Sequence, residues 1–357
     1  MQENAQNKGL KLFIIILIGI ILLFSKEENQ KKAIKFIEDI KISKKNLKVI
    51  ESIPINEGID DIFFYEKGIM VWKDKKLTRL NIDGSKEWEK EFNIDNPKIS
   101  FGEENIYVYE KPTGNIYFLN AMGETVHRIE LKAKINNVVE NFRNLLVHIK
   151  KENIESINIL DKKGKIIVNS LIKDGNILTY AMDKDNKNYV ISILNLKDKK
   201  LKSEIHVFEM GGKSLFNIEI QDEIILYSSF IDSDKIITMT DKGLYLINDG
   251  NILWKKQFQL IKDICINNDK INILFGNTLE TISIDGRVEE KHSFSEEYKK
   301  IFIYDKYLVV YGDEYIIGLK NGKEVFKYKS EERIHKVIQG EQKLILVYEN
   351  KIQLMSL

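Results

Sequence analysis

The stretch Asp249-Gly250-Asn251-Ile252-Leu253-Trp254 decides the fold, because variants of it recur along the chain. The recurring unit is a turn glycine followed within four residues by a bulky apolar side chain. Its seven glycines are Gly84, Gly123, Gly164, Gly212, Gly250, Gly286 and Gly322, so successive glycines are 39, 41, 48, 38, 36 and 36 residues apart. Asp-Gly and Asn-Gly suit a two-residue type I′ hairpin turn, in which both central residues have positive φ. We therefore expect seven β-hairpins at a spacing of about 40 residues.

The sequence between these turns predicts further strands. Short runs in which apolar residues alternate or cluster, such as 106–109, 116–119, 308–311 and 344–348, are separated by Gly, Asn and Asp. This pattern is typical of strand, turn and strand. A repeat of about 40 residues with four strands in each unit predicts an all-β fold, the β-propeller.

The number of blades follows from the turns. If each turn glycine joins the third and fourth strands of a blade, seven blades run from about residue 58 to residue 332. Residues 333–357 then supply three more strands, and Leu47–Ile53 is a spare strand that can pair with them, close the ring and cover two sheet edges. Eight four-stranded blades closed by an N-terminal strand are the favoured prediction, with seven as the alternative. The long fourth unit predicts an extended hairpin around Asp183–Asn188 or Lys197–Lys202.

The N-terminal segment predicts a membrane anchor. Leu12–Phe24 is an unbroken apolar run, which is short for the hydrocarbon core, but the span becomes feasible over residues 9–26 if the flanking lysines extend toward the headgroups. A cleaved signal peptide is the alternative, although small residues at alternating positions do not follow the run. The expected organisation is a short cytoplasmic tail (1–8), a transmembrane signal-anchor helix (9–26), a helical stalk (27–45) and the propeller (46–357).

Two of the repeats carry a resemblance to a known group. Asp83–Trp88 and Asp249–Trp254, with Asn321–Phe326 as a weaker copy, resemble the repeat of the quinoprotein-like (PQQ-repeat-like) β-propellers. That group includes quinone-cofactor dehydrogenases and outer-membrane assembly scaffolds. The chain as a whole also resembles a family of membrane-anchored propellers from Gram-positive anaerobes. This second resemblance implies an extracytoplasmic propeller, whereas lysines on both sides of the apolar run leave the orientation open.

The sequence predicts no catalytic, cofactor-binding or metal-ligating residues. Cys265 is the only cysteine, so the vicinal cysteine pair of quinone-dependent propellers is not present, and its apolar neighbours predict a core residue. The histidines are scattered and predict surface or strand-edge positions: His127, His148, His206, His292 and His335. Asp183–Asn188 begins like a calcium loop but lacks the glycine and the closing glutamate, which favours a hairpin tip. Phosphate-binding, dinucleotide and nucleophile-elbow motifs are not present in the sequence either.

The charge balance argues against a nucleic-acid partner. Lys plus Arg (55) nearly cancels Asp plus Glu (54), and residues 1–48 carry ten lysines against five acids, so the remainder is mildly acidic. We therefore expect a non-enzymatic, membrane-anchored scaffold at the cell envelope that binds an envelope protein, with its oligomeric state open. The alternative is a ligand-binding, hydrolytic or lyase propeller whose central funnel would hold carboxylates such as Asp60, Asp61, Asp222 and Asp263.

Overall fold

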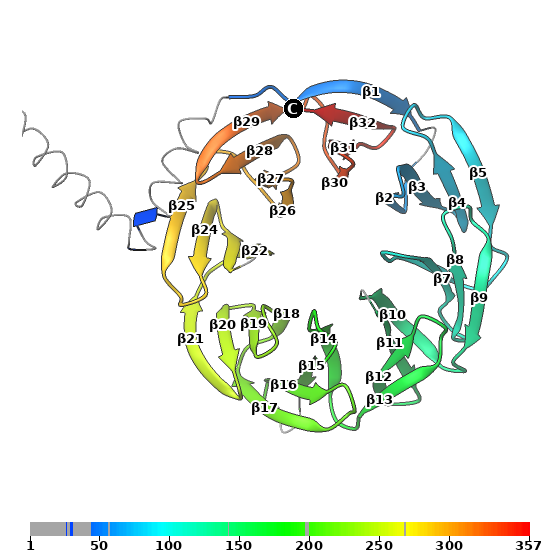
Figure 1. Ribbon diagram of the computed structural model, residues 1–357, viewed down its shortest axis with the longest axis vertical. Helices are drawn as coiled ribbons and strands as arrows, with labels where there is room; N and C mark the ends of the chain where they lie inside the picture. The colour runs from blue at the N-terminus through cyan, green and yellow to red at the C-terminus, as the bar shows by residue number, and fades with distance from the viewer. Residues whose placement is uncertain are drawn as a thin grey trace, which may run out of the picture.

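In the computed structural model, strands of the chain form a closed ring of eight sheets around a central axis (Figure 1). The structure describes residues 26, 29–30, 44–55, 58–141, 143–196, 200–267 and 269–357. The predicted tail, anchor and stalk lie outside these residues except at positions 26, 29, 30, 44 and 45. Among the described residues, no helix is long and apolar enough to cross a membrane.

Each blade is an antiparallel sheet whose strands follow one another from the centre of the ring to its rim. Blade 1 consists of β2 (Asp61–Tyr65), β3 (Gly68–Lys73), β4 (Lys76–Leu80) and β5 (Lys86–Glu91), and blade 2 of β6 (Pro97–Phe101), β7 (Ile106–Glu110), β8 (Asn115–Leu119) and β9 (Thr125–Glu130). Blade 3 consists of β10 (Lys134–Glu140), β11 (Asn144–Lys151), β12 (Ile154–Asp161) and β13 (Ile166–Ile172), and blade 4 of β14 (Asn176–Met182), β15 (Asn188–Asn195), β16 (Lys202–Glu209) and β17 (Ser214–Gln221).

The remaining blades repeat this order, and the last one takes its outer strand from the N-terminal side. Blade 5 consists of β18 (Ile225–Phe230), β19 (Lys235–Thr240), β20 (Gly243–Asn248) and β21 (Asn251–Gln257), and blade 6 of β22 (Ile261–Asn267), β23 (Lys270–Phe275), β24 (Thr278–Ser283) and β25 (Val288–Ser293). Blade 7 consists of β26 (Lys300–Tyr304), β27 (Tyr307–Tyr311), β28 (Tyr315–Lys320) and β29 (Lys323–Lys329), and blade 8 of β30 (Lys336–Gly340), β31 (Lys343–Val347), β32 (Lys351–Ser356) and β1 (Lys48–Pro54).

The predicted ring closure is confirmed. β1 pairs antiparallel with β32, so the blade made by the C-terminal residues gains its fourth strand from the beginning of the propeller. The backbone N–H of Lys45 also donates to the carbonyl oxygen of Val325 at 2.8 Å, and Leu47 is buried between blades 7 and 8. The prediction of eight blades is therefore correct, and the alternative of seven is wrong.

Apolar side chains of the middle strands form the core. In the described part of the chain the buried apolar residues fall into eight clusters, and each cluster joins two neighbouring blades. β7 and β20 illustrate the cause, because almost every residue of these middle strands is buried on both faces of its sheet. Burial of this kind contributes about 1.5–3 kcal/mol for each fully buried large side chain.

The turn glycines join third and fourth strands as predicted, but their turns are of two kinds. At Asp249-Gly250 and Asn321-Gly322 both central residues have positive φ, which confirms the type I′ prediction there. At Asp83-Gly84 and Asp285-Gly286 only the glycine has positive φ, so the prediction is wrong at these two turns. There the Asp carboxylate accepts the N–H two residues later, as Asp83 does from Ser85 at 2.9 Å, within a longer turn that ends in a β-bulge.

The tryptophan that follows two of these turns contacts the neighbouring blade. Trp254 of β21 donates from Nε1 to the carbonyl oxygen of Ile284 at 2.7 Å, in the third-to-fourth-strand turn of blade 6. A Cβ added to Gly286 in that turn would lie 3.1 Å from the Trp254 ring. In the same way, a Cβ added to Gly123 would lie 2.8 Å from the Trp88 ring. The two tryptophans thus dock sideways onto the next blade, and glycine is required where they approach.

Antiparallel order gives the ring two distinct faces. Turns between first and second strands and between third and fourth strands lie on one face, which we call the hairpin face. Turns between second and third strands, together with the segments that connect successive blades, lie on the other face, which we call the crossover face. The candidate sites below are placed by these two names.

Candidate functional site

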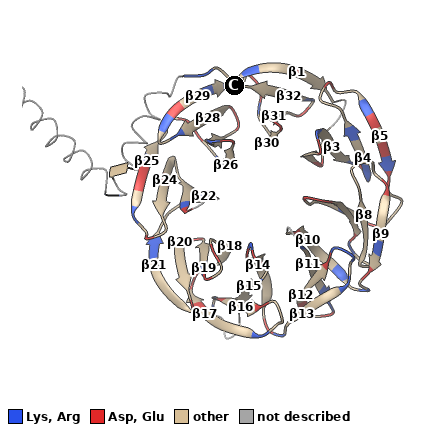
Figure 2. Ribbon diagram, in the orientation of Figure 1, with Lys and Arg blue, Asp and Glu red and all other residues tan. Residues whose placement is uncertain are grey.

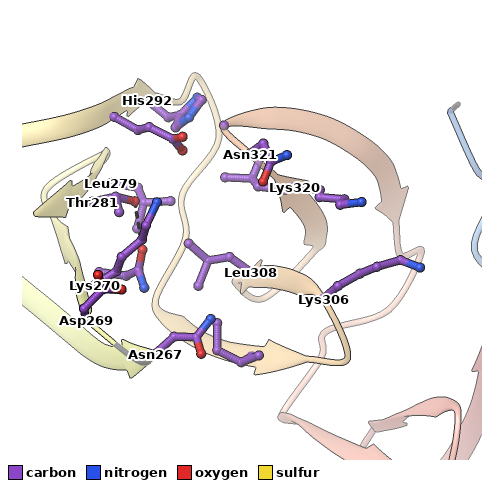
Figure 3. Close-up of a pocket in the computed structure, with 15 residues that line it drawn as sticks. Asn267, Asp269, Lys270, Leu279, Thr281, His292, Lys306, Leu308, Lys320 and Asn321 are labelled. Atoms are coloured by element: carbon purple, nitrogen blue, oxygen red, sulfur yellow. Dashed lines mark hydrogen bonds between the residues drawn. The ribbon is translucent and has the colours of Figure 1, made fainter. Parts of the chain in front are cut away.

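A polar groove of about 210 Å³ opens on the hairpin face between blades 6 and 7 (Figure 3). Its walls carry Asp269 and Lys270 from the turn between β22 and β23, and Lys306 and Lys320 from turns of blade 7. Figure 3 shows the two blade 7 lysines extending away from Asp269 and Lys270. Lys270 also pairs with Glu289 at 2.9 Å. The groove therefore carries both positive and negative side chains, but these do not converge on a common position where a ligand could bind.

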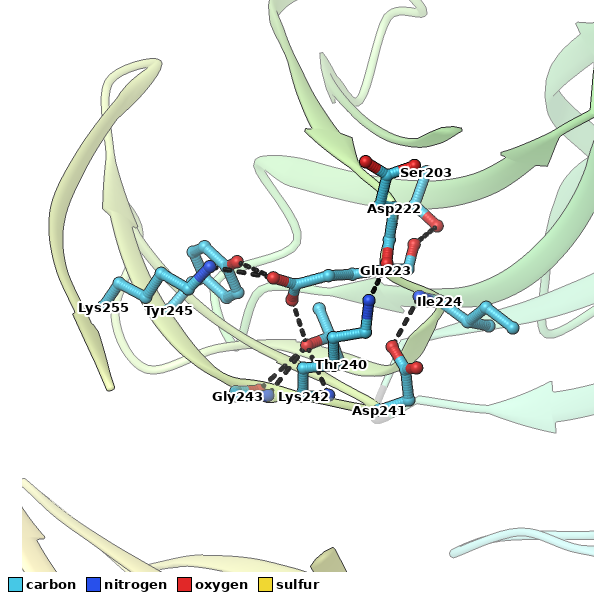
Figure 4. Close-up of polar contacts among 10 residues, drawn as sticks. All are labelled: Ser203, Asp222, Glu223, Ile224, Thr240, Asp241, Lys242, Gly243, Tyr245 and Lys255. Carbon is cyan, nitrogen blue, oxygen red and sulfur yellow. Dashed lines mark hydrogen bonds and ion pairs between the residues drawn. The ribbon is translucent and has the colours of Figure 1, made fainter. Parts of the chain in front are cut away.

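A buried carboxylate, Glu223, lies on the crossover face where blade 4 passes into blade 5 (Figure 4). Its Oε1 accepts hydrogen bonds from Tyr245 Oη and Lys255 Nζ, both at 2.8 Å, and its Oε2 accepts from Thr240 Oγ1 at 2.5 Å. Burial raises the pKa of this carboxyl, but these donors outweigh burial, so its pKa lies below the ordinary value. Both carboxylate oxygens are occupied by the protein itself, which indicates a structural role.

A second buried carboxylate, Glu155, joins blades 3 and 4. Its Oε2 accepts the backbone N–H of Ile177 at 2.8 Å and lies 3.2 Å from His148 Nε2, while Oε1 pairs with Lys150 at 3.3 Å. Burial lowers the pKa of His148 more than the Glu155 charge raises it. The sequence prediction of a surface or strand-edge position is wrong for His148, which is buried because Glu155 supplies it with a partner.

The four carboxylates predicted for a central funnel lie in different places. Asp61 pairs with Lys336 of blade 8 at 2.7 Å, and Asp263 lies 3.5 Å from Lys300 of blade 7. Asp60 accepts the N–H of Asp74 at 3.1 Å, and Asp222 lies in the segment between blades 4 and 5. Asp60 and Asp61 are consecutive at the start of blade 1, Asp222 lies between blades 4 and 5, and Asp263 lies in blade 6, so the four carboxylates occupy three different places around the ring.

The inner strands also carry apolar side chains. Phe63 of β2 stacks on Phe101 of β6 with ring centroids 4.8 Å apart, and Phe63 remains 36% exposed. Val139 on β10 and Leu226 on β18 are likewise exposed. The exposed positions of the inner strands also include the polar Lys98 and Asn137, so the inner surface of the ring mixes apolar and polar side chains.

Of the remaining predicted positions, the hairpin tip at residues 183–188 is confirmed, and Cys265 is partly buried. Asp183 is buried and accepts the backbone N–H of Lys187 at 2.8 Å and of Asn188 at 3.0 Å, which makes 183–188 a hairpin tip. Blade 4 has the extended strands expected of the long unit, while residues 197–199 of the predicted basic hairpin lie outside the described residues. Burial raises the pKa of Cys265 to about 11. Among the described residues, no group of three or more His, Cys, Asp or Glu side chains could hold a metal ion.

A cleft beside Leu260 is the feature that sequence reasoning missed. It measures about 630 Å³ and lies on the crossover face between the segment that joins blades 5 and 6 and the turn between β23 and β24. Leu260 is 77% exposed and has a φ of 56°, and its carbonyl oxygen accepts the N–H of Gly276 at 2.9 Å. Phe258 and Phe275 line the cleft with ring centroids 4.8 Å apart.

This arrangement favours contact with another protein. A leucine rarely adopts the left-handed backbone conformation, which costs roughly 1–3 kcal/mol and persists where the surroundings impose it. Here the strain holds a large apolar side chain in solvent next to two aromatic rings. The only sequence signal was the apolar Phe258 and Leu260 in a connecting segment, and the backbone angle cannot be read from residue type.

The closed ring, its inter-blade cores and its two faces define an eight-bladed β-propeller. The chain belongs to the family described as "Family of unknown function (DUF5711)", whose model matches residues 40–357. The comparison with curated proteins gives no match.

Solved structures at low identity share this fold. BamB from Moraxella catarrhalis aligns with a TM-score of 0.60 and 11% identity over 87% of this chain and 100% of its own. Sqt1 from Saccharomyces cerevisiae aligns with a TM-score of 0.63 and 11% identity over 88% and 98% of the two chains. The C-terminal WD40 domain of Sif2 gives 0.66 and 13% over 88% and 99%. At these identities the likeness establishes the fold alone.

Proposed function

We propose that this chain is a protein-interaction module of the cell envelope, a quinoprotein-like propeller held at the membrane by residues 9–26. Its propeller is extracytoplasmic, it performs no catalysis, and an envelope protein docks on its crossover face at the Leu260 cleft. Leu260 is the observation that carries the proposal, because a strained backbone keeps a large apolar side chain exposed beside the rings of Phe258 and Phe275. Apolar anchors in such clefts supply much of the binding energy at protein interfaces.

The chemistry of the cleft suits a partner that inserts an apolar side chain. Polar groups surround the apolar centre, among them Asn277, Lys291 and Glu280, and the last two form an ion pair at 2.8 Å. An apolar centre with a polar rim is the usual anatomy of a protein interface. The ligand-binding or hydrolytic alternative lacks comparable support, since the four candidate carboxylates lie at three different places around the ring.

Site-specific photocrosslinking in cells tests the docking site. A photoreactive residue at Asn277, which is exposed at the cleft, should give an adduct of defined mass with one envelope protein. The same residue at Glu152 should not, although Glu152 is also exposed, has a φ of 55° and lies in a crossover-face turn of blade 3.

The substitution Leu260→Asn separates docking from folding. Asparagine tolerates positive φ, so this variant should keep or raise the thermal stability of the propeller. It should also abolish the adduct at position 277, because the apolar anchor is gone. An adduct that persists in Leu260→Asn, or one no stronger at 277 than at 152, would overturn the proposal.

Membrane topology is tested independently. A reporter that is active only outside the cytoplasm, fused after Leu357, should be active in the full chain. An active cytoplasmic reporter at the same position would refute the extracytoplasmic placement and leave the docking experiment unaffected.

A further inference from the structure

Among the described residues, the outer strand of each blade has no further strand on its outer edge, and seven of these eight strands carry charged residues. Figure 2 shows blue and red segments along β5, β25 and β29. β17 carries Glu219, and β1, β9 and β21 also hold charged residues. Charged side chains on an edge strand oppose pairing with another chain. β13 is the exception, since Ile166–Ile172 reads Ile-Ile-Val-Asn-Ser-Leu-Ile and contains no charge, proline or glycine.

The two faces of β13 differ in what they contact. Val168 and Ile172 are buried against blade 4, and Ser170 Oγ lies 2.6 Å from Tyr189 Oη of that blade. The alternate residues Ile167 and Leu171 are 48% and 59% exposed, with the exposed Asn169 between them. Within the described part of the chain, β13 therefore combines an outer edge that pairs with no other strand with an exposed apolar stripe, which is the pattern of a strand that pairs with another chain.

The order of residues in β13 suits a second copy of itself. In an antiparallel pair centred on Asn169, Ile167 of each strand faces Leu171 of the other, and the two Asn169 side chains face each other. Every exposed position then meets a residue of its own kind, and no charge is desolvated. The equivalent pairing of β17 about Asn217 would place the apolar Leu215 against Glu219. Among the outer strands, β13 is the one whose exposed residues match themselves.

We propose that two copies of this chain pair through β13, which joins their two blade 3 sheets into one eight-stranded antiparallel sheet. Figure 1 shows the outer strands running around the rim, so the two-fold axis normal to this joint sheet lies roughly along the ring axis. Both rings then present the crossover face on the same side. The Leu260 cleft, in the segment between blades 5 and 6, stays outside the joint, so dimerisation and partner docking are separate events. A symmetric joint of this type closes on itself and does not propagate.

A disulfide across the two-fold axis tests the register. In the full chain with Cys265→Ser, the substitution Asn169→Cys places two thiols opposite each other, at a Cα separation within the range that disulfides span. Mild oxidation of membranes should convert this variant to a covalent dimer of twice the chain mass, reversible by reductant. Asn217→Cys, at the matching asparagine of β17, is the control and should remain monomeric.

A second substitution tests the apolar stripe. Leu171→Lys would bury a charge against Ile167 of the other copy, so it should reduce the Asn169→Cys dimer to the level of the control. Leu215→Lys, at an exposed position of β17, should leave that dimer unchanged. Thermal melts of the four variants separate loss of pairing from loss of folding.

The possible outcomes are distinct. A reducible dimer at 169 that Leu171→Lys removes supports the proposal. A monomer at 169 in a folded variant overturns it, as does an adduct with a different protein, which would assign the β13 edge to another partner. Neither outcome depends on position 260, so failure here leaves the docking proposal intact.

Discussion

Replacing Glu223 by glutamine should destabilise the propeller far more than the same change at an exposed glutamate. The carboxylate of Glu223 accepts three hydrogen bonds, from Lys255, Tyr245 and Thr240. A hydrogen bond to a charged group contributes about 1.5–3 kcal/mol and one between neutral groups about 0.5–1.5 kcal/mol. The amide of glutamine keeps one acceptor and turns an NH₂ group toward a donor. Because Lys255 is 37% exposed, its ion pair is partly screened, and we expect a net loss of about 2–4 kcal/mol.

Urea and thermal unfolding of Glu223→Gln and Glu219→Gln measure this difference. Glu219 pairs with Lys202 at 2.9 Å but is 55% exposed, so its loss should cost less than about 1 kcal/mol. For a domain of this size each 1 kcal/mol lowers Tm by roughly 2–4 °C, so Glu223→Gln should unfold about 4–16 °C below the parent. A variant Thr240→Val combined with Glu223→Gln should be non-additive, since both remove one hydrogen bond.

The pH dependence gives a second readout with a defined sign. The pKa of Glu223 in the folded chain lies below its ordinary value, because the hydrogen bonds from Lys255, Thr240 and Tyr245 outweigh burial, which raises it. The stability that the carboxylate contributes is therefore complete above the unfolded value of about 4.3 and is lost as pH falls through the folded pKa. The gap between parent and Glu223→Gln should be full at neutral pH and close in acid. Equal stabilities of Glu223→Gln and Glu219→Gln at pH 7 would refute the reasoning.

Two further predictions concern the turn glycines and the cysteine. Gly286→Ala should cost about 1–3 kcal/mol, because φ is +84° and the new Cβ would lie 3.1 Å from the Trp254 ring, whereas Gly211→Ala, with no atom within 4 Å, should cost less than about 0.5 kcal/mol in the same melts. Equal costs would contradict the docking of Trp254 on Gly286. Cys265, whose pKa burial raises to about 11, should react with iodoacetamide at pH 8 at least about a hundredfold more slowly than a free thiol, measured by intact mass. Alkylation at the rate of an unfolded control would show that this side chain is accessible.

The blade count was predictable because its signals are local. A turn between the third and fourth strands needs a residue with positive φ, and glycine fills that position in every one of the seven repeats. The closing strand 48–54 was predictable for a related reason, since a blade with three strands and a strand without a blade leave two edges that pairing removes. Residue type and spacing along the chain carry both signals.

The buried carboxylates were not predictable because their partners are distant in sequence. Glu223 bonds to residues 17 to 32 positions later, and the choice among many lysines and tyrosines depends on how blade 5 packs on blade 4. His148 was placed at the surface for the same reason, since its isolated sequence shows no partner, whereas the fold supplies Glu155. The exposed, strained Leu260 was not predicted, because residue type does not indicate that a leucine will adopt a positive φ.

The tryptophans show how a correct pattern can leave a contact unspecified. The repeat places a bulky residue four positions after Gly84 and Gly250, and both tryptophans pack against apolar clusters between blades, but residue type does not say which turn each ring meets. In the structure, Trp88 and Trp254 each contact the glycine of the following blade and donate to a carbonyl oxygen in the same turn. The glycine thus has two functions, since it allows the turn in its own blade and makes room for the ring from the preceding one. Both functions constrain Gly123 and Gly286, so a side chain at either position would disturb the turn and the contact between blades together.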